Sequence, residues 1–155
     1  MTGAEYRRWA LDALRERSAQ RGIAVTGRKD RPRLLLASRD GLSLSYQEDW
    51  WRSAFKRSGY GGFFAFENEA SDPQSQPAIV LLINLSKFFV PMRSPENVEQ
   101  VEYFVDRLLL LSKWCVDEKL DEFRALASEP ATTLSKAERA ARTLREFMQL
   151  PHAES

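Results

Sequence analysis

The stretch "LLLASRDGLSLSY", residues 34–46, decides the fold. Its Asp40-Gly41 dipeptide lies between two apolar runs, and tight hairpins prefer this dipeptide because both turn residues need positive φ. After the turn, Leu42, Leu44 and Tyr46 alternate with serines, which is the period of a strand that buries one face. The stretch therefore predicts two antiparallel strands, at 33–38 and 42–46.

Further strands are predicted on both sides of this hairpin. A short strand at 23–26 precedes a basic turn, and Pro32 is expected to keep the next strand from starting earlier. "GGFFAFEN" (61–68) and "PAIVLLINL" (77–85) are separated by a polar loop with two prolines, which predicts another antiparallel pair. "SKFFVPM" (86–92) either extends the sheet or ends it, since Pro91 limits how far a strand can run.

Helices are predicted around the strands. Thr2 and Glu5 form a capping box for a first helix that ends at Gly22. A second box, Ser45 with Glu48, predicts a middle helix from about Tyr46 to Ser58.

The C-terminal part is predicted to be helical. Ser94 and Pro95 start a long helix or two abutting ones with a break near Asp117. Ser135 and Glu138 start a last helix that runs to about Gln149.

In the predicted middle helix, Trp50, Trp51 and Phe55 share one face and are interpreted as core anchors. The "GYGG" at 59–62 follows a helix and opens a strand in this interpretation. A phosphate-binding glycine loop has the opposite order, so the glycines are not interpreted as a phosphate site.

These elements together predict the fold class. We expect an α+β single domain over residues 1–150, with a short tail at 151–155. Its mainly antiparallel sheet of four to five strands packs against an N-terminal helix, a middle helix and C-terminal helices.

Composition narrows the class of protein. The chain has 155 residues, of which 43% are apolar, and its apolar runs are shorter than the ~20 residues that cross a bilayer. Cys115 and His152 are the only residues of their types, so neither a disulfide nor a zinc site is expected. We expect a cytoplasmic protein that is neither exported nor membrane-bound and that carries no cofactor.

Charge is divided unevenly along the chain. Residues 1–60 hold 13 Lys and Arg against 7 Asp and Glu, whereas residues 61–155 hold 10 against 15. Such a division indicates either a face for a polyanion or two halves that attract each other. The candidate nucleic-acid contacts are the cations of the basic turn and of the predicted middle helix: Arg28, Lys29, Arg31, Arg33, Arg52, Lys56 and Arg57.

Catalysis has weaker support. Glu67, Glu69 and Asp72 end a predicted strand and are the candidate ligands of a hard cation, as a small metal-dependent nuclease would require. The alternative is a solvated strand end. Cys115 lies in an apolar helical segment, where burial would blunt a thiol, and no base for it is evident in the sequence.

A protein partner is the remaining possibility. The helix beginning near Pro95 is apolar around much of its circumference, so either the last helix or a second subunit is expected to cover it. We therefore expect a non-catalytic binding, accessory or assembly subunit, with nucleic acid as a further ligand, and the nuclease as the enzymatic alternative.

Overall fold

The computed structural model of the chain describes residues 2–49, 51–52, 58–68, 78–84, 95–129 and 134–150. The elements follow in the order α1 (Gly3–Gln20), β1 (Ala24–Arg28), β2 (Arg31–Arg39), β3 (Leu42–Gln47), β4 (Trp51–Arg52), β5 (Ser58–Gly59), β6 (Phe63–Asn68), β7 (Ala78–Asn84), α2 (Val98–Glu118), α3 (Leu120–Ser128) and α4 (Leu134–Met148). This α+β architecture confirms the predicted class.

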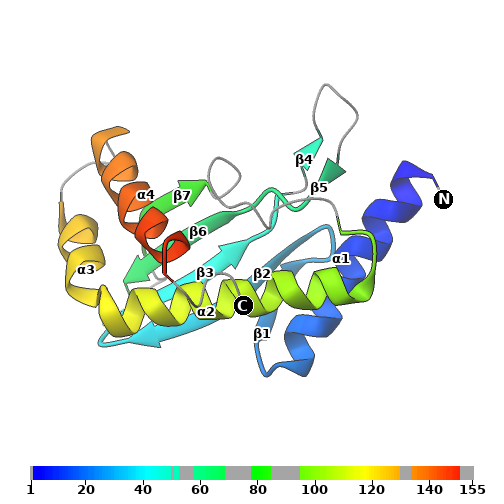
Figure 1. The fold of residues 1–155 in the computed structure, drawn as a ribbon, viewed down its shortest axis with the longest axis horizontal. Coiled ribbons are helices and arrows are strands. Elements are labelled where there is room, and N and C mark those ends of the chain that lie inside the picture. The colour runs from blue at the N-terminus through cyan, green and yellow to red at the C-terminus, as the bar shows by residue number, and fades with distance from the viewer. Residues whose placement is uncertain are drawn as a thin grey trace.

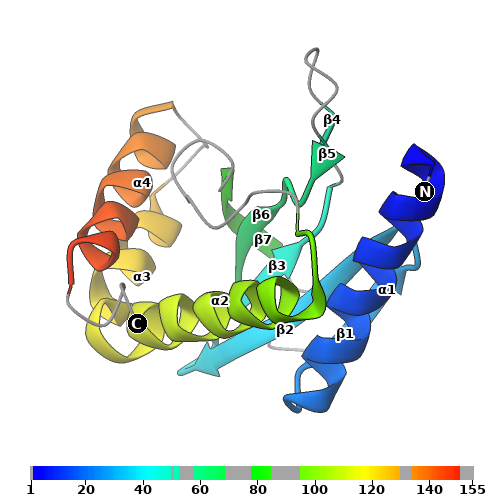
Figure 2. The same cartoon turned by 45° about the vertical axis from the view of Figure 1, so that its right-hand side comes forward.

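Five strands form one antiparallel sheet in the order β1-β2-β3-β6-β7. One row of paired residues across it, Val25, Leu34, Tyr46, Phe64 and Ile83, faces the core. Buried side chains from all four helices join the same cluster. Figures 1 and 2 show α2 crossing this face, with α1 on one side of it and α3 and α4 on the other. The helices therefore cover one face of the sheet.

The ends of α1 follow the predicted signals. Thr2 is the N-cap, and its hydroxyl accepts a hydrogen bond from the Glu5 amide at 3.1 Å. The helix ends at Gln20, and Gly22 has a φ of 77°. Ala10, Ala13 and Leu14 are buried.

The central hairpin is confirmed. Asp40 and Gly41 have φ values of 52° and 81°, which is the positive φ that its turn requires. The expected effect of Pro32 is wrong, because β2 begins at Arg31. Pro32 still accepts a bond from the Glu48 amide at 2.9 Å, and the Gln47 side-chain amide donates to the Glu48 carbonyl at 3.4 Å. Gln47 thus supplies a donor where proline has none.

The predicted middle helix is wrong. Tyr46 belongs to β3, and β4 pairs with β5 as a two-stranded antiparallel ribbon, Trp51 opposite Gly59 and Arg52 opposite Ser58. Trp50 and residues 53–57 lie outside the described part of the chain. The prediction that Trp50 and Phe55 anchor the core therefore stays a prediction.

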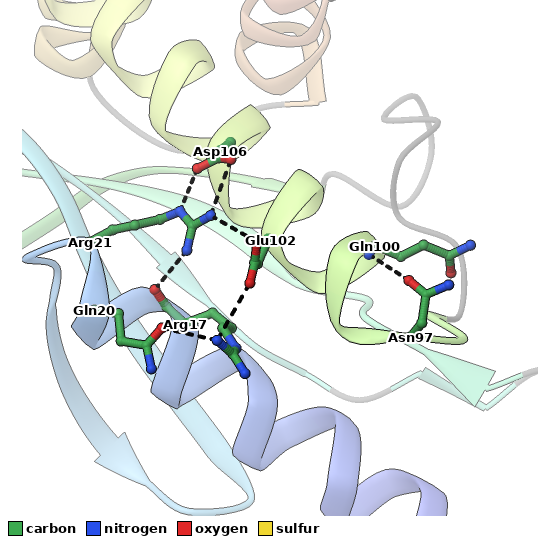
Figure 3. Close-up of polar contacts among 7 residues, drawn as sticks. All are labelled: Arg17, Gln20, Arg21, Asn97, Gln100, Glu102 and Asp106. Atoms are coloured by element: carbon green, nitrogen blue, oxygen red, sulfur yellow. Dashed lines mark hydrogen bonds and ion pairs between the residues drawn. The ribbon is translucent and has the colours of Figure 1, made fainter.

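The C-terminal helices are confirmed with shifted starts. α2 begins at Val98, and its N-cap is Asn97, whose side chain accepts a bond from the Gln100 amide at 2.9 Å (Figure 3). The helix is therefore capped by Asn97 and not by the predicted N-cap Ser94. Ser94 itself lies outside the described residues. The expected break falls at Lys119, between α2 and α3.

The start of α4 also differs from its predicted cap. The helix begins at Leu134, so Ser135 lies inside it. The segments predicted at 86–92 and 151–155 lie outside the described residues.

The last glycine of "GYGG", Gly62, serves close packing. A Cβ on Gly62 would lie 2.4 Å from the Gln47 carbonyl oxygen and 2.4 Å from Cζ of the Tyr46 ring. Tyr46 is fully buried, and its ring lies 5.7 Å from that of Phe104 on α2. Only a residue without a side chain lets β6 begin this close to Tyr46.

We predict that Gly62→Ala destabilises the fold by about 1–3 kcal/mol, because the added methyl group overpacks a buried ring and a backbone carbonyl. Urea unfolding followed by circular dichroism measures the change. Gly3→Ala is the matched control, since a Cβ there meets nothing within 4 Å. An equal effect of the two substitutions would contradict the packing explanation.

Candidate functional site

The face of the sheet opposite the helices is the most extended candidate surface. Its central row runs across five strands and consists of Ala24, Leu35, Ser45, Ala65 and Leu82, each paired with the next. Leu35 is 43% exposed and Leu82 is 46% exposed. Among the described residues, no helix side chain belongs to a core cluster on this side. We call this surface the helix-free face.

A buried polar cluster lies in the middle of the helix-free face. Arg33 donates from Nη2 to Glu67 Oε1 and from Nε to Ser45 Oγ at 3.2 Å. Ser45 Oγ lies 3.4 Å from the same carboxylate oxygen. Ser45 and Glu67 are almost completely buried, while the Arg33 side chain is half-buried. The arginine therefore compensates a carboxylate that would otherwise lose its hydration.

Three other cations proposed for nucleic acid, Arg28, Lys29 and Arg31, lie in or near the β1–β2 turn. Arg28 pairs with Asp30 at 3.1 Å, and Arg31 pairs with Asp49 at 3.4 Å. Lys29 is exposed between them. Pairs this exposed contribute little to stability, about 0–1 kcal/mol each, so the turn keeps cations on the surface.

Of the seven cations proposed to contact nucleic acid, the structure describes the side chains of only four, and these four do not form one cluster. Arg33 turns toward Glu67 on the helix-free face, while Arg28 and Arg31 each have a carboxylate partner close in the chain or on the adjacent strand end. The Arg52 side chain is outside the description, as are Lys56 and Arg57. Nucleic-acid binding stays a prediction.

Cations of α1 pair with the acidic second half of the chain (Figure 3). Arg17 lies 3.4 Å from Glu102, and Arg21 hydrogen-bonds Asp106 and lies 3.7 Å from Glu102. The hydrogen bond to Asp106 raises the pKa of Arg21. At the end of β2, Arg39 pairs with Asp117 of α2 at 2.8 Å. The uneven charge of the chain is thus partly used to hold its own halves together.

The candidate metal ligands are only partly described. Glu67 is held by Arg33 and Ser45, whereas Glu69 and Asp72 lie outside the described residues. Within the described ranges, no three His, Cys, Asp or Glu side chains form a group that could hold a metal ion. The nuclease stays a prediction, and its one described carboxylate already has a cationic partner.

Most of the apolar band of α2 is covered by the protein itself. Phe104, Leu108, Leu111 and Cys115 are buried in the core. Burial raises the pKa of the Cys115 thiol, which disfavours its reactive thiolate. What remains on the surface is a narrow stripe in which Tyr103 is 45% exposed and Leu110 is 40% exposed.

A second buried polar cluster lies on the helix side, where β3 ends. The Glu48 side chain has 0% exposure. Its Oε2 accepts a hydrogen bond from the Tyr46 hydroxyl at 2.6 Å, and its Oε1 accepts one from the Gly61 amide at 3.2 Å. Nearby, the Tyr60 hydroxyl donates to the Ala10 carbonyl of α1 at 2.6 Å. These bonds tie α1 and the start of β6 to the end of β3.

Burial raises the pKa of Glu48 from 4.5 to about 7. The bonds from Tyr46 and Gly61 act in the opposite direction, as does the charge of Arg7, while Asp49 raises the value further. Desolvation dominates because it penalises the ionised form in a site without water contact. Burial also raises the pKa of Tyr46 and of Tyr60, so both hydroxyls stay protonated and able to donate.

The sequence analysis missed Glu48 because its spacing from Ser45 matches a capping box. A signal was present: Glu48 continues the period-two series of Leu42, Leu44 and Tyr46, which are all buried on the core face. Read as a strand, the series places a carboxyl group in the core.

Comparisons with protein-family models, with curated proteins and with solved structures find no match to this chain. In the part of the chain that is described, no helix has the length and apolarity to cross a membrane.

We predict that Arg33 and Glu67 are coupled by about 1–2 kcal/mol in a double-mutant cycle of Arg33→Met, Glu67→Gln and the double variant. Each single change leaves a buried or half-buried polar group without its partner, while the double change removes both charges. Urea unfolding of the four proteins measures the coupling. The same cycle on Arg28 and Asp30 is the control for an exposed pair, and additive effects at both pairs would contradict the prediction.

We predict that the free energy of unfolding falls as the pH rises from about 4.5 to 7 and that the Glu48 contribution then levels off. The folded protein binds a proton at Glu48 in this window and the unfolded chain does not, so stability decreases with pH. The loss amounts to about 3 kcal/mol at roughly 1.4 kcal/mol per pH unit.

Urea unfolding at several pH values tests this expectation. Glu48→Gln keeps an acceptor for Gly61 and is expected to lose this pH dependence and to exceed the wild-type stability above pH 7. Glu16→Gln, at an exposed carboxylate of α1, is expected to behave as wild type. A wild-type slope in Glu48→Gln would assign the effect to other groups.

Proposed function

We propose that the protein is a non-catalytic domain that works by binding another protein, and that the helix-free face is the contact surface. The observation that carries the proposal is the exposure of Leu35 and Leu82 in the same row of the sheet. A solvent-facing side of an antiparallel sheet normally carries polar side chains.

The composition of the helix-free face supports a protein ligand. Ala24 is exposed in the row of the two leucines, and Phe63 is half-buried in the neighbouring row, whereas Ala65, in the row between the leucines, is buried. The central polar cluster is satisfied internally by Arg33 and Glu67, so a partner meets apolar side chains without having to neutralise an isolated charge. Apolar surface surrounding satisfied polar groups is typical of protein interfaces.

The stripe on α2 is the competing surface for the same function. This stripe is where the sequence placed a partner, on the helix beginning near Pro95. Tyr103 and Leu110 are themselves residues of α2, however, and most of the other apolar residues of this helix are already buried in the core. The guanidinium of Arg107 also lies 5.8 Å from the centre of the Tyr103 ring, so this tyrosine has an intramolecular contact. The helix-free face adds the exposed Ala24 and the half-buried Phe63 to its two leucines, so we place the contact there.

We predict that a Leu35→Glu/Leu82→Glu variant loses its partner, because two buried charges would be placed in the interface. Quantitative co-purification from the native host, followed by mass spectrometry, compares it with wild type. Light scattering over a wide concentration range tests whether that partner is a second copy.

The matched control is Leu110→Glu, which charges a leucine of similar exposure on α2. It is expected to retain the partner and the association state of the wild type. Loss of the partner in Leu110→Glu alone would assign binding to α2. If neither a partner nor self-association is found with the wild-type protein, the binding proposal fails.

Nucleic acid is a second candidate ligand, favoured by the exposed cations of the β1–β2 turn. Arg28 and Arg31 have only surface partners and can exchange them for phosphates. We predict that any affinity for DNA or RNA falls steeply between about 50 and 200 mM salt and weakens in Arg28→Ala/Lys29→Ala/Arg31→Ala, as measured by fluorescence anisotropy. Affinity that is independent of salt and of these residues would contradict phosphate contact.

A further inference from the structure

Strand β1 is an open edge of the sheet. Among the described strands it pairs with β2 alone, and Ala24, Thr26, Gly27 and Arg28 are exposed. Natural edge strands are commonly protected by charged side chains, by proline or by a bulge. Between Ala24 and Gly27, β1 has none of these, because its only charged residue is Arg28 and its register with β2 is continuous. The edge is therefore able to pair with a further strand.

The main-chain groups that point outward from this edge belong to Val25 and Gly27. The Pro32 carbonyl accepts a hydrogen bond from the Glu48 amide at 2.9 Å, so the main-chain groups of Pro32 face β3. Gly27, the partner of Pro32 in β1, therefore faces away from β2, and Val25 points the same way because the direction alternates along a strand. In the described part of the chain, no hydrogen bond outside the β1–β2 ladder reaches these N–H and C=O groups.

The outward groups of β1 are complementary to themselves in one register. Their series stops before Val25, because the Ile23 amide already donates to the Ser18 carbonyl at 3.1 Å, and it stops after Gly27, where the β1–β2 turn begins. In an antiparallel pair with a second copy, all of these donors and acceptors find partners only when Thr26 lies opposite Thr26. Val25 of each copy then exchanges both of its hydrogen bonds with Gly27 of the other.

The side chains that meet in this register also fit one another. Val25 lies opposite Gly27 of the second copy, which has no side chain, and Arg28 lies opposite the small Ala24. Thr26 meets Thr26, a cross-strand pair that stabilises sheets. The two Arg28 residues are separated by about 13 Å along the pair, which exceeds the screening length of about 8 Å at physiological salt. No like charges therefore lie opposite each other.

We propose that β1 is a dimerisation edge, through which two copies of this chain pair antiparallel about Thr26 and join their sheets into one continuous sheet. A second copy is favoured over an unrelated strand because both the main-chain pattern and the side chains of β1 complement themselves. The edge is separate from Leu35 and Leu82, so this interface is additional to the contact proposed for the helix-free face, and neither needs the other.

Sedimentation equilibrium over a wide concentration range tests the interface, and the wild-type protein is expected to dimerise reversibly. Thr26→Lys and Thr26→Glu are each expected to weaken the dimer by roughly tenfold, because like charges then lie opposite each other. An equimolar mixture of the two variants is expected to restore the dimer through opposite charges, which misfolded variants could not do. Leu35→Glu/Leu82→Glu is expected to keep it, so failure of this interface and failure of the helix-free face are distinguishable.

Cross-linking tests the register. Thr26→Cys is expected to form a disulfide-linked dimer on mild oxidation, because Cα atoms of such a pair lie about 4.5 Å apart, a spacing that a disulfide can bridge. Ser38→Cys, at an exposed position near the end of β2, is the matched control and should cross-link far less, while Cys115 is buried.

A wild-type protein that stays monomeric at all concentrations would overturn the proposal, as would a dimer that both charge variants of Thr26 keep. If a monomeric wild type instead loses a co-purified protein on Thr26→Lys, the edge belongs to another protein and the second-copy proposal fails.

Discussion

The burial of Tyr46 is the constraint on which the rest of the structure depends. Its ring lies against Gly62 on one side and forms an edge contact with Phe104 of α2 on another. Its hydroxyl bonds the buried Glu48. One residue thus fixes where β6 starts, how closely α2 approaches the sheet and where the Glu48 carboxyl lies, so these features are tied to one packing arrangement.

The sequence predicted the elements whose signals are local and repeated. The Asp40-Gly41 turn, the alternation from Leu42 to Tyr46 and the cap at Thr2 each have a single physical explanation, and the structure shows all three. The region 46–58 was predicted as a helix because Ser45 and Glu48 have capping spacing. In the folded protein Ser45 instead contacts the Arg33–Glu67 pair, and Glu48 is in the core. The role of Ser45 depends on strand neighbours distant in sequence, which no local pattern contains, whereas the burial of Glu48 follows from the period-two series once that series is taken as a strand.

Charge shows the same limit of local reasoning. The excess of cations in residues 1–60 permitted either a polyanion surface or attraction between the two halves of the chain. The contacts of Arg17, Arg21 and Arg39 with Glu102, Asp106 and Asp117 use part of this excess within the fold. Composition measures how many charges are available, but only topology decides which of them meet.

Strand β3 connects the two polar clusters of the molecule. Ser45 points to the helix-free face, where it bonds Arg33, while the next residue, Tyr46, points to the core and bonds Glu48. A glutamine at position 48 would keep an acceptor for the Gly61 amide and carry no titratable group, so the carboxyl has a desolvation cost at neutral pH that an amide would not have. Proteins tolerate such costs chiefly at positions with a functional role.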